Sequence, residues 1–211
     1  MSERRPGMRY AETAFPAGAV SAGGKASGVI GPNAALQLAA AMTALQGGTD
    51  TDRLFDAAGL SCWLSAPPGD MVPVCDVERL YAVLYRDWPK IGGAVCADAG
   101  RRTADYVIAN RIPAVVRSLL RMLPVDLSAP LLARAVVRNA WTFAGEGALR
   151  VLPGRPMKFL LQGQALAIAG CPWHRAVFRQ LFRVLVSPRA TVAHARYAGP
   201  DGPGDVLIVR W

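Results

Sequence analysis

Two histidines and four cysteines are the side chains of this chain that are best suited to bind a metal ion. The cysteines are Cys62, Cys75, Cys96 and Cys171, and no two of them form a Cys-x-x-Cys pair. This spacing predicts neither a disulfide framework nor a local zinc or iron–sulfur site. We therefore expect free thiols, most of them buried.

The two histidines, His174 and His194, could each ligate a metal, and each has a plainer alternative. His174 falls in the first turn of an expected helix, where a neutral imidazole could act as a capping acceptor. On an expected strand, His194 shares one face with Val192 and lies opposite Ala195 and Tyr197. If that second face is the core, His194 is exposed to solvent or to a partner.

Arginine dominates the net charge of +9, and the excess lies in the second half of the chain. Residues 101–211 carry 16 basic and 5 acidic side chains, whereas residues 1–100 carry 8 and 10. Arginines recur four residues apart on three expected helices, which indicates a solvated face, an acidic partner protein or an anionic membrane surface. A GC-rich genome would also produce such a composition. No nucleic-acid-binding motif accompanies the charge, so we expect no nucleic-acid partner.

The length of 211 residues and a hydrophobic share of 52% predict one globular domain. We assign it to residues 29–211, after a flexible tail over residues 1–28 that is rich in Gly, Ala, Ser and Pro. No run of 18 uncharged apolar residues predicts a membrane-spanning helix. The charged N-terminus lacks a following apolar region, so we expect a cytoplasmic protein.

Hydrophobic residues recur at helical spacing through the first two thirds of the chain. We expect helices over 32–46, from 49 or 51 to 58, 76–88 and 91–109, then one between Pro113 and Leu123 and one that begins at Ser128-Ala-Pro130. The segment 60–75 is expected to be a loop. In the helix over 91–109, small residues such as Gly92, Gly93 and Gly100 would let another helix approach closely.

After Trp141 the hydrophobic pattern changes to that of short strands. We expect strands over 142–143, 148–152, 158–161 and 166–169. An amphipathic helix from Pro172 to Ser187-Pro188 follows, and then a hairpin of strands 191–197 and 206–211 with a loop over 198–205. The change of period predicts an α+β fold, with a helical N-terminal half packed on a mostly antiparallel sheet.

Five stretches carry a family resemblance: Ile30–Asn33, Ala104–Pro113, Ala140–Gly145, Cys171–Phe182 and Ser187–Ala190. On these, residues 30–211 resemble the bacteriochlorophyll 4-vinyl reductase (BchJ) family of phototrophic bacteria, within the wider 4-vinyl reductase (V4R) domain group. The resemblance implies an α+β fold, often dimeric, with a pocket for a flat apolar ligand between helices and sheet.

Many V4R domains also hold a structural zinc ion near the C-terminal hairpin. At the positions that correspond to its ligands this chain has Tyr197 and Asp205, with His194 where an acidic ligand is usual, and only Cys171 is retained. We therefore expect no zinc.

The family name implies reduction of a vinyl group on a chlorophyll precursor, which needs a nicotinamide, a flavin or an iron–sulfur centre. The sequence has no Gly-x-Gly-x-x-Gly after a strand, no phosphate-binding loop and no cysteine cluster. We therefore favour a non-catalytic tetrapyrrole carrier that holds and delivers a Mg-porphyrin or a divinyl protochlorophyllide-type intermediate. A vinyl reductase with an external electron donor and a sensor of smaller aromatic ligands remain as alternatives.

A carrier needs aromatic rings for the macrocycle, arginines for its carboxylates and an axial ligand for magnesium. The side chains that could supply them are Trp141, Phe143, Trp173, Phe178 and Phe182 as rings, Arg111, Arg117 and Arg175 as carboxylate partners, and His174 or His194 as axial ligands. For the rings the plainer interpretation is hydrophobic core, and for the arginines a solvated face. Expected partners are pathway enzymes such as Mg-chelatase and a second copy of the chain, with at most peripheral membrane contact.

Overall fold

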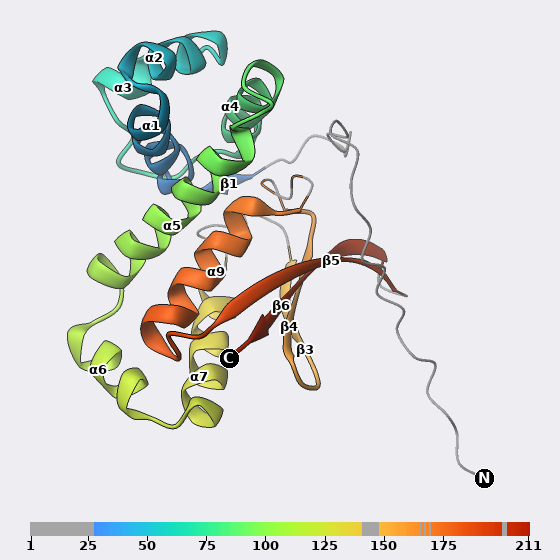
Figure 1. The fold of residues 1–211 in the computed structure, drawn as a ribbon. Helices are drawn as coiled ribbons and strands as arrows, with labels where there is room; N and C mark the ends of the chain where they lie inside the picture. Colours follow the sequence, from blue (N-terminus) through green and yellow to red (C-terminus); the bar gives the residue numbers. More distant parts are fainter. Residues whose placement is uncertain (1–27, 141–147, 165, 167, 169, 200–201) are drawn as a thin grey trace.

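Helices form the first half of the chain and an antiparallel sheet forms most of the second, as the computed structural model shows (Figure 1). The structure describes residues 28–211 except 141–147, 165, 167, 169 and 200–201. The tail expected over residues 1–28 therefore lies outside the described residues apart from Gly28. The strand expected over 142–143 lies outside them as well. The predicted α+β class is confirmed.

The N-terminal part consists of β1 (Val29–Ile30), α1 (Asn33–Gln46), α2 (Gly48–Ala57), α3 (Cys62–Ser65), β2 (Val72–Pro73), α4 (Val74–Asp87) and α5 (Gly92–Asn110). The helices expected over 32–46, from 49 or 51 to 58, and over 91–109 correspond to α1, α2 and α5, and their bounds are confirmed to within a few residues. The loop expected over 60–75 is wrong in part, because it contains α3 and β2, and β2 pairs with β1. Elements of two to four residues are too short to show a hydrophobic period.

Two further helices follow, α6 (Ala114–Met122) and α7 (Val125–Arg138). The expected start of the second at Ser128-Ala-Pro130 is wrong, since α7 begins directly after Pro124 and Pro130 lies inside it. A proline at this position removes one intrahelical hydrogen bond and crowds the carbonyl of the residue four before it, yet α7 continues through Pro130. Pro124, with its extended backbone, sets the actual start.

The sheet has the strand order β3-β4-β6-β5, and all of its pairs are antiparallel. Its strands are β3 (Ala148–Leu152), β4 (Met157–Gln162), β5 (Thr191–Gly199) and β6 (Gly202–Arg210). The loop expected over 198–205 is wrong, because the ladder continues to the pair Gly199–Gly202. Gly202, the first residue of β6, has a φ of 95°, a conformation that favours glycine. In the segment 166–169, Leu166 lies in a turn and Ile168 in irregular structure, so no strand forms at these described positions.

Helix α9 (Pro172–Leu185) connects the two halves, since it contacts both α5 and strand β5 (Figure 1). Phe178 and Phe182 pack edge-on against Phe159 of β4, with ring centroids 4.7 and 6.0 Å apart. On its other side α9 crosses α5 at Gly100, where an added Cβ would overlap the Trp173 carbonyl oxygen. The close helix approach predicted from small residues is thus confirmed at Gly100.

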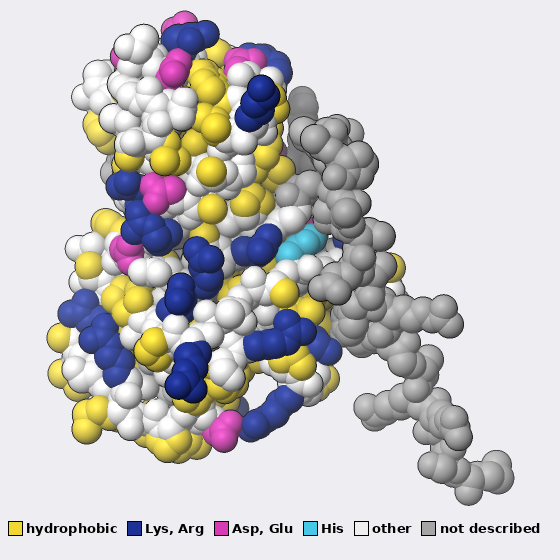
Figure 2. Space-filling model, viewed as in Figure 1, with side chains coloured by type: hydrophobic (Ala, Val, Ile, Leu, Met, Phe, Trp, Pro, Cys, Tyr) yellow, Lys and Arg dark blue, Asp and Glu magenta, His cyan; other side chains and the backbone are white. Residues whose placement is uncertain are grey.

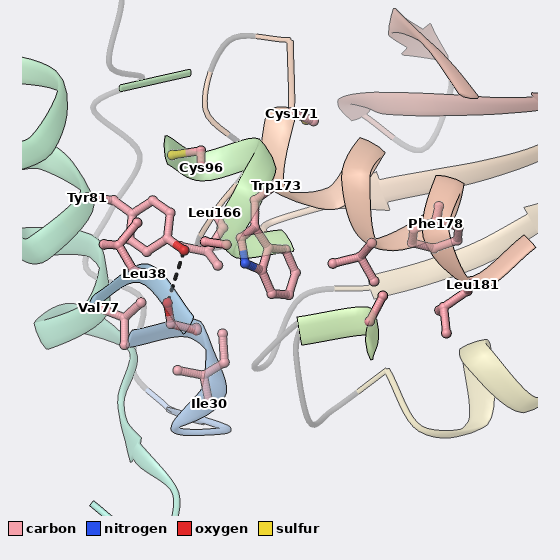
Figure 3. Packing of buried hydrophobic residues seen from close by; sticks show 14 of the residues in the cluster. Ile30, Leu38, Val77, Tyr81, Cys96, Leu166, Cys171, Trp173, Phe178 and Leu181 are labelled. Atoms are coloured by element: carbon pink, nitrogen blue, oxygen red, sulfur yellow. Dashed lines mark hydrogen bonds between the residues drawn. The ribbon is translucent and has the colours of Figure 1, made fainter. Parts of the chain in front are cut away.

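Trp173 lies between two groups of buried side chains (Figure 3). Leu38 and Tyr81 belong to the N-terminal helices, and the Tyr81 hydroxyl donates a hydrogen bond to the Ala34 carbonyl over 3.0 Å. Phe178 belongs to the side that packs on the sheet. One continuous core therefore joins the N-terminal helices to the sheet through α9.

Candidate functional site

A pocket of about 620 Å³ lies among helices α1, α5, α7 and α9 and the loop 68–71. Its volume is in the range of small-molecule binding sites. The apolar part of the lining includes Leu36, Ile112, Leu132, Val136, Val177 and Leu181, and the polar part includes Gln37, Thr103, Tyr106, Arg111 and Asn139. The pocket implied by the resemblance lay between helices and sheet, whereas the described lining comes from helices and loops alone.

Trp173 forms a wall of this pocket and is one of the residues predicted from the sequence. Its side chain is 1% exposed, and its indole Nε1 has no hydrogen-bond partner among the described residues. A buried N–H without a partner costs free energy. At this exposure the ring contributes little surface to the pocket, and a ligand could meet the ring or its Nε1 only if Trp173 or its neighbours moved.

Arg111 is the predicted arginine that lines the pocket. It follows the last residue of α5 as the C-cap and is exposed, so its guanidinium can reach solvent and the pocket rim. Asp70, on the loop 68–71, is the acidic residue of the described lining. A ligand carboxylate would therefore find its bidentate partner at Arg111.

The other predicted arginines lie elsewhere. Arg117 on α6 donates from Nη1 to the Ile108 carbonyl oxygen over 2.7 Å and so caps the end of α5. Arg175 is exposed on α9. Neither is among the residues of the described pocket lining.

Of the aromatic residues predicted to contact a ligand, Trp173 is among the lining residues of the pocket, whereas Phe178 and Phe182 are not. Phe178 and Phe182 lie in the core between α9 and β4, and Val177 and Leu181 line the pocket from the neighbouring positions of the helix. Trp141 and Phe143 lie outside the described residues.

His174 is fully buried beside Trp173, with their rings edge to face at 5.1 Å, and is not part of the pocket lining. Neither of its ring nitrogens has a hydrogen-bond partner among the described residues. Burial lowers the pKa of His174 to about 4, against the opposing influence of the Asp205 carboxylate and the Leu166 backbone. At neutral pH it is therefore an uncharged core side chain.

His194 on β5 forms a hydrogen bond through Nε2 with Oδ1 of Asp205 on β6 over 2.6 Å. Its side chain is 6% exposed, so the alternative of an exposed His194 is wrong. That alternative assumed a core on one sheet face only. Both faces bury residues, with Val192 in the main core and Ala195 and Tyr197 in a second cluster.

Cys171 completes a cluster with this pair, since the ligand atoms of Cys171, His194 and Asp205 all lie within 4.8 Å of one another. Cys171 precedes α9 in the left-handed conformation, with a φ of 44°. Burial, and next the Asp205 carboxylate, raise the pKa of the Cys171 thiol well above its usual range. The thiol is therefore protonated at neutral pH.

The donor types of this cluster suit zinc, but their number does not match the four nitrogen or sulfur ligands of a structural site. Tyr197, which the resemblance places at a ligand position, lies in the cluster on the opposite sheet face. The carboxylate and imidazole already satisfy each other by a hydrogen bond. The expectation that no zinc binds stays a prediction.

The sequence was compared with known proteins. No family model matches it. It is 37% identical over 180 residues to the bacteriochlorophyll synthase 23 kDa chain of Cereibacter sphaeroides. The aligned segment covers 82% of this chain and 86% of that relative. The chain of that name from Rhodobacter capsulatus is 36% identical over 185 residues, 85% of each chain. This chain belongs to the bacteriochlorophyll synthase 23 kDa chain family.

Solved structures with a similar fold include H-NOX proteins. A mutant H-NOX protein from K. algicida in its unliganded Fe(II) form aligns with a TM-score of 0.57 at 10% identity, over 86% of this chain and 96% of that one. An H-NOX protein studied for heme distortion gives a TM-score of 0.55 at 9% identity, over 86% and 95%. At such identities the likeness shows the fold alone. This chain thus shares its fold with these H-NOX proteins.

The resemblance placed Cys171, His194 and Asp205 at the positions of one ligand set, and the structure brings these three together. Sequence reasoning missed one feature of the pocket. The contribution of α7 to the pocket, through Leu132 and Val136, could have been found from the stripe of apolar residues on that helix.

Proposed function

We propose that this member of the 23 kDa chain family binds a tetrapyrrole intermediate of bacteriochlorophyll biosynthesis in the pocket and delivers it to an enzyme of the pathway. The ligand class is a Mg-porphyrin or a divinyl protochlorophyllide-type pigment. The observation that carries the proposal is the pocket of about 620 Å³, which has a mostly apolar lining and includes Arg111 among its lining residues.

The side chains of the pocket suit such a ligand. Apolar side chains from α7 and α9 would bury the macrocycle, and Arg111 would bind a peripheral carboxylate. Magnesium prefers oxygen ligands, and the polar lining offers amide and hydroxyl oxygens at Gln37, Asn139 and Tyr106. These groups replace the histidines as candidate axial ligands, because neither His174 nor His194 belongs to the lining.

The comparisons support the same class of ligand. Both curated relatives are named as chains of bacteriochlorophyll synthase. Solved proteins of this fold include one studied for protein-induced distortion of a porphyrin, with a TM-score of 0.52, 9% identity, and coverage of 83% of this chain and 96% of that one. The fold is thus compatible with an enclosed tetrapyrrole. Pathway enzymes such as Mg-chelatase and a second copy of the chain remain proposed partners.

The test is a titration with magnesium protoporphyrin and with divinyl protochlorophyllide, with and without NADPH or dithionite, followed at the Soret band. We expect a saturable shift at micromolar pigment and recovery of unchanged pigment. Absence of binding to both pigments would refute the proposal. Recovery of a monovinyl product would establish a vinyl reductase instead of a carrier.

A matched pair of variants locates the binding site. Ala135 lines the pocket from α7 and is exposed, so Ala135→Phe should fill the pocket without disturbing the core. Ala44, exposed on α1, is not part of the lining, and Ala44→Phe is the control. We expect Ala135→Phe to weaken binding at least about tenfold and Ala44→Phe to leave it unchanged.

A further inference from the structure

Exposed hydrophobic side chains are concentrated at one corner of the molecule. Of the ten large hydrophobic residues that are exposed in the described part of the chain, six lie on α6 and the first half of α7. These six, Val115, Val116, Leu119, Met122, Leu127 and Leu131, define the α6–α7 surface. Exposed apolar residues are ordinarily scattered singly, so their clustering indicates a binding surface.

Helix α6 is apolar on two faces. Leu120 is buried against the domain, whereas Val115, Leu119 and Met122, spaced four and three residues apart, form a second stripe that is 79%, 52% and 84% exposed. A surface helix would ordinarily carry polar residues on this outer side. The stripe thus lacks any cover among the described residues.

Two arginines hold α6 in this orientation. Arg117 donates to the Ile108 carbonyl of α5, and Arg121 donates from Nε to the Val184 carbonyl at the end of α9 over 3.1 Å. Because both bonds tie α6 to neighbouring backbone, the outer stripe cannot turn inward without breaking them.

The region around the α6–α7 surface is strongly basic. Helices α6, α7 and α9 together contain seven arginines and one acidic residue, Asp126. Asp126 already pairs with Arg155 over 2.8 Å. Figure 2 shows Lys and Arg side chains spread over the half of the molecule that contains these helices, with hydrophobic side chains along its lower left edge.

We propose that the α6–α7 surface docks the protein onto an anionic membrane surface. The apolar side chains would enter the boundary between headgroups and acyl chains, and the exposed arginines of α7, Arg134 and Arg138, would contact lipid phosphates. A second copy of the chain is a poorer occupant, because a symmetric contact would bring the same basic regions together. An anionic bilayer matches both the apolar stripe and the charge.

Helix α7 connects this surface to the pocket. Leu127 and Leu131 lie on the exposed side, while Leu132 and Val136 line the pocket. If the pocket holds a pigment as proposed above, docking would place one of its walls beside the bilayer. The surface itself is inferred independently of that function, so the test uses protein without pigment.

The experiment is co-flotation with vesicles of phosphatidylcholine alone or with phosphatidylglycerol added. We expect binding only to the anionic vesicles and a steep loss of binding as salt is raised. Leu119→Gln combined with Met122→Gln should weaken binding at least about tenfold. Leu45→Gln on α1, where Leu45 is 47% exposed, is the matched control and should bind as the wild type does.

Arg134→Gln combined with Arg138→Gln tests the electrostatic part of the interaction. This variant should bind anionic vesicles more weakly and should have the same oligomeric state as the wild type. No flotation of the wild type at low salt would overturn the proposal, and so would equal binding by the Leu119/Met122 variant. Self-association that is abolished by that variant, without vesicle binding by the wild type, would assign the surface to a second copy instead. Circular dichroism of each variant verifies that it is folded.

Discussion

The α-carbon of Gly100 on α5 lies against the backbone carbonyl of Trp173 on α9, so the two helices touch at the residue that forms a pocket wall. A side chain at position 100 would overlap the Trp173 oxygen and meet the Ala176 Cβ at 3.1 Å. Since both neighbours belong to one helix, α9 as a whole would have to move. The position of Trp173 therefore depends on the absence of one methyl group.

Gly100→Ala should lower the free energy of unfolding by about 1–3 kcal/mol, because the added methyl group cannot be accommodated without shifting α9. Gly93→Ala on the same helix is the control, since a Cβ there meets nothing within 4 Å. That change should stabilise the protein by up to about 1 kcal/mol through helix propensity. Urea unfolding measures both, and equal effects of the two changes would contradict this account.

The sequence predicted the elements that have a clear hydrophobic period, such as α1, α5 and α9. It failed where a local signal competed with the wider context. Pro130 suggested a helix start, yet it lies inside α7. The Gly/Pro-rich stretch near Gly202 suggested a loop, yet β6 begins at Gly202. Propensity is a weak prior that tertiary packing overrides.

The candidate site was harder to predict than the fold. Trp173 and Arg111 reach the pocket, while Phe178 and Phe182 face the sheet one residue away along α9 from Val177 and Leu181. An amphipathic stripe shows that a helix is buried, but it does not say which buried side chain meets a cavity. That distinction depends on where α5 and α7 cross α9, which is a tertiary property.

Acid should destabilise the protein through His174. Its pKa is lowered from 6.5 to about 4 in the folded state, so the unfolded chain binds the proton more readily. The contribution of neutral His174 to the free energy of unfolding is therefore complete above pH 6.5, and it is lost as the pH falls from 6.5 toward 4. The full amplitude is on the order of 3 kcal/mol.

His174→Leu isolates this contribution, because other titrating groups are common to both proteins. Between about pH 7.5 and pH 4.5 the variant should gain about 2–3 kcal/mol of stability relative to the wild type. Urea unfolding at both values measures the gain. Parallel pH curves for the two proteins would show that the histidine is not buried in its neutral form.

The Cys171, His194 and Asp205 cluster should hold together without a metal ion. We expect no stoichiometric zinc by mass spectrometry, and a melting temperature that changes by less than about 1 °C in EDTA. Asp205→Asn should lower the free energy of unfolding by about 1–3 kcal/mol, since it removes the carboxylate bound by His194.

Asp126→Asn is the control for that change, because its carboxylate is 65% exposed and pairs with an exposed arginine. Its effect should stay within about 0.5 kcal/mol. Stoichiometric zinc whose removal lowers the melting temperature would contradict the metal-free interpretation.

Arg111 should determine the affinity for pigments with free carboxylates. Because it is the arginine of the described pocket lining, Arg111→Gln should weaken binding of magnesium protoporphyrin by about tenfold, the value of one charge-assisted pair. The dimethyl ester of the same porphyrin lacks the negative charge and should bind the wild type and the variant equally. Arg189→Gln, at an exposed residue beyond α9, is the control and should discriminate the two ligands as the wild type does. Equal weakening of acid and ester by Arg111→Gln would mean that the guanidinium shapes the pocket instead of binding a carboxylate.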